Sequence, residues 1–156
     1  MFRLDKVVQA CVAEYRQIYP GTAFITDFAA VTINGTPEYI AQLLDKVVAN
    51  AVDFAPAGKP VRLSCKSDTG EAVISVANPG PGLEAHMKDR IFEPMVSVRP
   101  DGNNKVPHLG MGLHIVRMIT EYHGGYLYAD NLIEEEGVIV VIRLPLAKGA
   151  SSADKH

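Results

Sequence analysis

The chain has 156 residues, and 47% of them are hydrophobic, which is enough to fill the core of one compact domain. Fifteen basic and eighteen acidic residues give a formal net charge of −3. The basic residues are scattered rather than gathered into a stripe, which argues against a nucleic-acid partner. We expect one domain over residues 1–146 and a disordered tail over 147–156.

Neither a membrane span nor a disulfide framework is indicated. No apolar run approaches the roughly 20 residues needed to cross a bilayer, and the N-terminal segment lacks the apolar centre of a signal peptide. Cys11 and Cys65 have no metal-site spacing and lie in apolar periodic segments. We therefore expect buried, reduced thiols in a reducing compartment, and no membrane contact by this chain.

The N-terminal half predicts two amphipathic helices joined by short strands. Apolar residues recur at helical spacing over residues 4–18. Short strands are expected over 23–28 and 31–33. Thr36 offers an N-cap with proline at the first helical position. The apolar face that follows predicts a second helix ending near Pro56.

A β-hairpin is predicted in the middle of the chain. Apolar and polar residues alternate over 61–66 and over 72–76, with turn residues between the two runs. Residues 84–92 can form a short helix. Residues 97–107 contain two prolines, a glycine and two asparagines with almost nothing apolar, which predicts a mobile loop.

The C-terminal third predicts a helix followed by two strands. Residues 110–123 are helical in period and are closed by two glycines. Strands are expected over 126–130 and 138–144, and the second is apolar on both faces, which suits a central place in a sheet. This order favours a two-layer α/β sandwich, in which about three helices cover one face of a mixed sheet.

Asn50 is a polar residue on the apolar face of the second predicted helix. Leu43, Val47 and Phe54 share its inward stripe. A polar amide there needs partners. It is either a core asparagine bonded to backbone or an oxygen donor aimed at Mg²⁺.

Two glycine-containing segments lie downstream of Asn50. Asn78-Pro79-Gly80-Pro81-Gly82 follows directly on the second hairpin strand. It is either a plain strand-exit turn or a stiff turn whose glycines let a flat ring approach the backbone. Gly110, Gly112 and Leu113 open the helix predicted over 110–123, where free N–H groups can bind an anion.

The order and spacing of these segments resemble the nucleotide site shared by histidine kinases, DNA gyrase B subunits, Hsp90 chaperones and MutL mismatch-repair proteins. The resemblance covers most of residues 4–144. It implies a site for ATP and Mg²⁺ beneath a mobile lid loop, with Asn50 as the metal ligand. It also implies that two glycine boxes hold the nucleotide, formed here by Gly80 and Gly82 and by Gly110, Gly112 and Leu113.

Further residues match the family pattern or depart from it. Phe92 matches the phenylalanine box at the base of the lid, and Arg99 and Lys105 in the lid become candidates for phosphate contact. Asn78 stands where an Asp accepts the adenine amino proton. An asparagine accepts it without charge assistance or, with its amide flipped, donates to guanine O6. Lys46 stands where hydrolytic members carry a water-activating Glu, and lysine is a poor base near neutral pH.

None of the five histidines has the sequence context of a phosphate acceptor. The resemblance therefore implies the catalytic part of a two-component sensor kinase, which transfers the γ-phosphate of ATP to a histidine on a separate dimerisation domain, with a response regulator downstream. The alternatives are an interaction module with weak or no ATP turnover and a serine-kinase or anti-sigma relative. We expect a cytoplasmic location, either as an independent chain or as a piece of a protein anchored in the inner membrane.

Overall fold

The computed structural model describes residues 1–88, 90–93 and 107–148, and for residues 107–111 it describes the backbone alone. In this part of the chain, five strands form one mixed sheet in the order β2-β4-β5-β7-β6. β2 and β4 are parallel, and every other neighbouring pair is antiparallel. The strands are β2 (Phe24–Phe28), β4 (Val61–Asp68), β5 (Glu71–Pro79), β6 (Tyr126–Asn131) and β7 (Gly137–Pro145).

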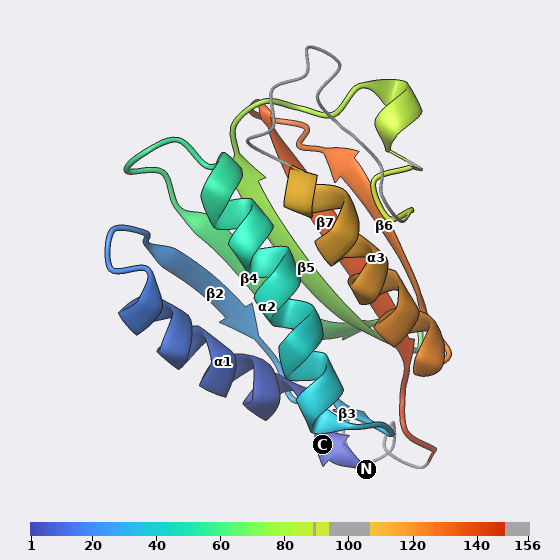
Figure 1. The fold of residues 1–156 in the computed structure, drawn as a ribbon. Helices are drawn as coiled ribbons and strands as arrows, with labels where there is room; N and C mark the ends of the chain where they lie inside the picture. Colours follow the sequence, from blue (N-terminus) through green and yellow to red (C-terminus); the bar gives the residue numbers. More distant parts are fainter. Residues whose placement is uncertain (89, 94–106, 149–156) are drawn as a thin grey trace.

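Three α-helices of the described chain cover one face of this sheet (Figure 1). They are α1 (Leu4–Ile18), α2 (Pro37–Phe54) and α3 (Pro107–Tyr122). The strand alternation explains this layering, because Val61, Leu63 and Cys65 of β4 are buried while Arg62 and Lys66 are exposed. The two-layer sandwich and the central hairpin are thus confirmed, and β7 lies inside the sheet as predicted.

A small second sheet lies at the start of α1 and was not predicted. β1 (Phe2–Arg3) pairs antiparallel with β3 (Thr32–Ile33). The Asp5 carboxylate accepts hydrogen bonds from the Arg3 guanidinium at 2.7 Å and from the Val31 N–H at 3.1 Å. Burial tends to raise the pKa of Asp5, but these two partners outweigh it and hold that pKa below its usual value. Asp5 therefore ties the small sheet to α1 as a carboxylate.

The structure corrects three predicted boundaries. α3 begins at Pro107 rather than Gly110, because proline is favourable at the first helical position. The helix predicted over 84–92 is reduced to the single 3-10 turn η1 (Ala85–Met87), since flanking residues are tied to β6. Ala147, assigned to a disordered tail, is buried, and its N–H donates to Thr32 O at 3.0 Å. Residues 149–156 and most of the predicted loop over 97–107 lie outside the described residues.

The N-terminus of α2 is held by the C-terminal end of α3. α2 begins at Pro37 as predicted, but the Thr36 side chain makes no capping hydrogen bond. Instead, the Thr36 N–H donates to His123 Nε2 at 3.1 Å, and His123 Nδ1 lies 2.8 Å from Ile119 O. The ring packs so closely on Gly35 that a Cβ there would overlap it. This contact fixes α2 against α3.

Both cysteines are free and buried, as predicted. Burial raises the pKa of the Cys11 thiol to about 11 and that of the Cys65 thiol to about 12. Both are therefore protonated at neutral pH and unsuited to nucleophilic chemistry. Within the described ranges, no helix is long and apolar enough to cross a membrane.

Candidate functional site

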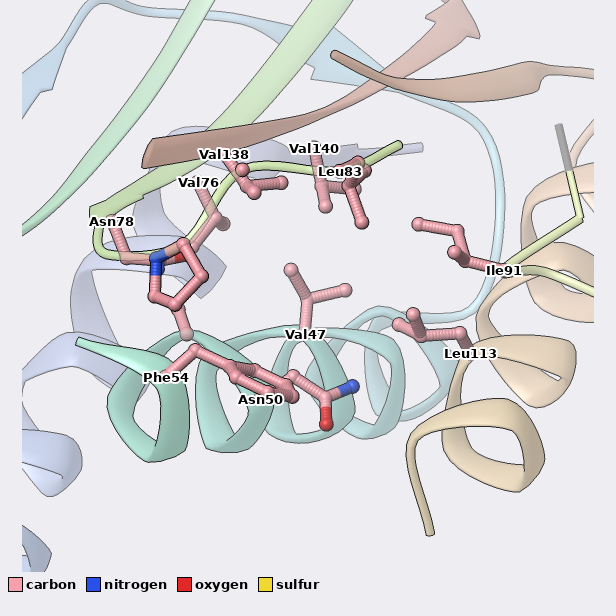
Figure 2. Close-up of a pocket in the computed structure, with 13 residues that line it drawn as sticks. Val47, Asn50, Phe54, Val76, Asn78, Leu83, Ile91, Leu113, Val138 and Val140 are labelled. Atoms are coloured by element: carbon pink, nitrogen blue, oxygen red, sulfur yellow. The ribbon is translucent and has the colours of Figure 1, made fainter. Parts of the chain in front are cut away.

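A cavity of about 220 Å³ lies between α2, α3 and the ends of β5 and β7 (Figure 2). Most of its wall is apolar, and two side-chain amides, those of Asn50 and Asn78, contribute polar groups. Such a slot is typical of a small-molecule site. The lining residues are Val47, Asn50, Ala51, Phe54, Val76, Asn78, Pro81, Gly82, Leu83, Ile91, Leu113, Val138 and Val140.

Asn50 lies in this wall on the inward stripe of α2. Val47 and Phe54, one turn on either side, line the same cavity, so the predicted helical stripe is confirmed. Only 8% of Asn50 is exposed. Within the described residues, its amide makes no hydrogen bond to another residue, so the backbone partner required by a purely structural core asparagine is missing there. The amide is thus available to a ligand.

Asn78 lies at the opposite wall, near the end of β5, and is 6% exposed. Its Nδ2 donates to Pro79 O at 2.9 Å. That bond occupies an amide proton and leaves Oδ1 as the group that can accept from a ligand. The second proton of Nδ2 is not used by this bond.

The glycines of the 78–82 turn are in contact with other parts of the protein. Gly80 has φ +131°, and a Cβ there would lie 2.5 Å from Phe54 O at the end of α2. A Cβ on Gly82 would lie 2.8 Å from Asn131 Oδ1. Both positions therefore have a packing reason for glycine. Gly82 lines the cavity itself, and Gly80 shapes the turn that carries Asn78.

The start of α3 brings the second predicted glycine segment to the same region. Leu113 is buried and lines the cavity. Gly112 faces the stem of Lys46, whose Cδ would lie 3.7 Å from a Cβ on that glycine. Because α3 starts at Pro107, Gly110 and Gly112 lie inside its first turns, and the free N–H donors of a regular helix belong to the residues before them. Their predicted helix-opening position is corrected accordingly.

In the segment that contains Phe92, the residue that lines the cavity is the neighbour of the predicted one. Phe92 is buried in the core, whereas Ile91 lines the cavity. Arg99 and Lys105 lie outside the described residues.

Several residues of this region were missed from the sequence. Strand alternation turns Val76, Val138 and Val140 towards the helices, but it does not show that they border a cavity rather than packed core. Leu83 directly follows the segment from Asn78 to Gly82, and this adjacency was the available signal. Asn131, which bonds Leu83, gave no signal, because its pairing is between residues far apart in the sequence.

The family described as histidine kinase-, DNA gyrase B-, and HSP90-like ATPase matches residues 35–148. The chain belongs to this family. Among its relatives, the sensor protein ChvG of Agrobacterium fabrum is 36% identical over 127 residues, which make up 80% of this chain and 21% of that protein. This ATPase-family chain thus spans about a fifth of the length of that relative, and the resemblance read from its motifs is confirmed.

Solved histidine-kinase structures share the fold of this ATPase-family chain. The mycobacterial sensor histidine kinase MprB superimposes with a TM-score of 0.80 at 22% identity, covering 94% of this chain and 96% of that one. Full-length ShkA in complex with AMPPNP gives 0.70 at 26% identity, with 92% and 29% covered. Histidine kinase ThkA in complex with response regulator protein TrrA gives 0.76 at 20% identity, with 94% and 41% covered.

Proposed function

We propose that this chain is the catalytic part of a two-component sensor kinase, which binds ATP with Mg²⁺ and presents the γ-phosphate to a histidine on a separate dimerisation domain. The observation that carries the proposal is the meeting of Asn50, Asn78 and Leu113, from three separate segments, in one cavity. Family membership and the identity with a sensor protein support it. A response regulator is the proposed downstream partner, in keeping with the complex formed by ThkA.

The donor set of the cavity suits a cation that arrives with phosphate. No group of three or more His, Cys, Asp or Glu side chains in the described chain could hold a metal ion by itself. Asn50 offers one hard oxygen donor, and Mg²⁺ commonly takes its remaining ligands from phosphates and water. When bound, Mg²⁺ neutralises charge on the transferring phosphoryl group.

The other residues of the site contact different parts of the nucleotide. Asn78 accepts from the amino group of adenine through Oδ1, while the apolar walls and Gly82 receive the flat ring. The first N–H groups of α3 and the lid residues Arg99 and Lys105 serve the phosphates, and Gly110 and Gly112 allow a close approach because they lack a side chain. Phe92, buried at the base of the lid segment, anchors it to the core.

Lys46 separates a kinase from a hydrolase in this proposal. It occupies the position one turn before Asn50, with its stem against Gly112. A lysine side chain is a poor general base for activating water. Phosphoryl transfer rests mainly on positioning and charge neutralisation, and the acceptor histidine can obtain its base from the domain that carries it.

The unmodified chain is expected to bind ATP, to hydrolyse it negligibly, and to phosphorylate a supplied helical hairpin that bears a suitable histidine. Radiolabelled γ-phosphate would report both hydrolysis and transfer. Lys46→Glu is expected to raise slow hydrolysis without improving transfer, because it places a carboxylate one turn from Asn50. Brisk hydrolysis by the unmodified chain alone would overturn the kinase proposal in favour of a hydrolytic one, and failure to bind ATP would favour an interaction module.

Asn78→Asp is expected to tighten ATP binding by something on the order of 1 kcal/mol and to weaken any GTP binding, because a carboxylate accepts from adenine with charge assistance. The bond to Pro79 O is lost in both the free and the bound protein. Its loss therefore lowers the melting temperature more than it alters affinity. Calorimetric titration with ATP and with GTP shows whether each affinity rises or falls. Equal changes for the two nucleotides would mean that Asn78 does not distinguish between the bases.

A further inference from the structure

Asn131, the last residue of β6, bonds both backbone polar groups of Leu83. Its Oδ1 accepts from the Leu83 N–H at 2.6 Å, and its Nδ2 donates to the Leu83 carbonyl oxygen at 3.0 Å. This single amide side chain thereby makes the pair of backbone hydrogen bonds that a neighbouring strand would make. Leu83 lines the cavity, as Figure 2 shows, whereas Asn131 does not.

Only a side chain with a donor and an acceptor at this reach can make both bonds. Aspartate keeps the acceptor but lacks the donor, and glutamine carries one more methylene. The neighbouring Gly82 is shaped around the same amide, because a Cβ there would lie 2.8 Å from Asn131 Oδ1. The amide therefore determines the position of two consecutive wall residues, Gly82 and Leu83.

The connection between β6 and β7 makes a second contact with the 78–82 turn. The Gly80 N–H donates to Glu136 O at 3.1 Å. A Cβ on Gly137 would lie 2.4 Å from Asn78 O in the neighbouring strand β5, so β5 and β7 are closely packed at this end of the sheet. The segment from Gly80 to Leu83 is thus bracketed by Glu136 at one end and Asn131 at the other.

We propose that Asn131 is a positioning residue for the nucleotide base: it holds the Gly82–Leu83 wall of the cavity in place before the ligand arrives. This role rests on the proposed function, because that function identifies the ligand of the cavity as a nucleotide. A wall that is already fixed loses little conformational freedom on binding, so the gain appears as affinity. Asn131 itself touches no ligand in this arrangement and acts through Leu83.

The neighbouring ion pair provides a matched control. Lys88 Nζ lies 2.7 Å from Asp130 Oδ1, which also joins the segment after Leu83 to β6. The Lys88 partner holds the pKa of Asp130 below its usual value; the Asp130 side chain is largely in solvent, and that of Lys88 is 34% exposed. An exposed pair of this kind contributes little. Asp130 Oδ1 also accepts from the Asn131 N–H at 2.8 Å, a bond that an asparagine carbonyl can keep. Asp130→Asn therefore removes the ion pair and retains both bonds to Leu83.

Calorimetric titration with ADP is the test, with melting temperatures to verify folding. Asn131→Ala is expected to weaken ADP binding about tenfold, while Asp130→Asn stays within roughly twofold of the unmodified chain. Amide hydrogen exchange at Leu83 should accelerate in the first variant and not in the second. If the unmodified chain binds no ADP, the proposed function fails; if it binds ADP and Asn131→Ala binds equally, the positioning role alone is overturned.

Asn131→Asp separates positioning from general destabilisation. At neutral pH its carboxylate would face the Leu83 carbonyl oxygen without a proton to donate, so affinity falls as it does for alanine. As the pH is lowered through the ordinary pKa of an aspartyl side chain, about 4, protonation restores a donor, and ADP affinity relative to the unmodified chain should recover. A ratio that stays constant with pH would count against the two-bond arrangement.

Discussion

Replacing Asn50 by alanine is expected to reduce Mg²⁺-dependent ATP affinity by roughly 100-fold, since interactions with a charged partner are worth about 1.5–3 kcal/mol each. The side chain lines the cavity and bonds no other residue in the described chain, so its removal costs little folding stability. Calorimetric titration with and without Mg²⁺ measures the loss, and thermal unfolding verifies the fold.

Gln42→Ala is the matched control for this substitution. It removes an amide from an exposed position of the same helix and leaves the cavity unchanged. Its ATP affinity should match that of the unmodified chain at every Mg²⁺ concentration. If Asn50→Ala also retained full metal-dependent binding, Asn50 would return to the alternative of a structural core asparagine.

Gly80→Ala is expected to lower the free energy of unfolding by about 2–4 kcal/mol, because it combines backbone strain with a steric clash. The residue has φ +131°, and the new Cβ would lie 2.5 Å from Phe54 O, a backbone atom that cannot rotate away. Relief requires the turn to separate from α2, which moves Asn78 away from Asn50. Nucleotide affinity should fall together with stability, as urea unfolding and ADP titration would measure.

Gly58→Ala measures the cost of a positive φ without a steric clash. Gly58 has φ +81°, but nothing lies within 4 Å of a Cβ placed there. The strain alone is expected to cost roughly 1–2 kcal/mol, with no loss of ADP affinity from the folded protein. Equal unfolding energies for the two variants would mean that the contact between Gly80 and α2 is unimportant.

Local periodicity predicts the layers of this fold and the stripe that carries Asn50. A 3.6-residue apolar period turns Val47, Asn50 and Phe54 in one direction, and a two-residue alternation turns one face of the hairpin towards the helices. These signals depend on neighbours along the chain. That is why they remain valid without knowledge of the rest of the molecule.

Contacts between distant segments leave no such signal. The bonds between Asn131 and Leu83 and between His123 and Thr36 join residues that are far apart in the sequence, so no local pattern predicts them. The 84–92 segment has enough helix formers for a helix, yet only one turn forms after Leu83, whose backbone is bonded to Asn131 of β6. Propensity is a weak prior where tertiary contacts compete with it.

The long ladder between β5 and β7 bears on how much change in length the segment between these strands can tolerate. Nine consecutive residue pairs join the two strands, from Glu71 with Pro145 to Pro79 with Gly137. The ladder therefore holds together the two ends of the chain segment that connects these strands. That segment reaches the cavity through Leu83, Ile91 and Leu113. Closure entropy grows slowly with length, by about 0.6 kcal/mol for each doubling. A change of length within this segment therefore costs little closure entropy and leaves the nine pairs between β5 and β7 in register.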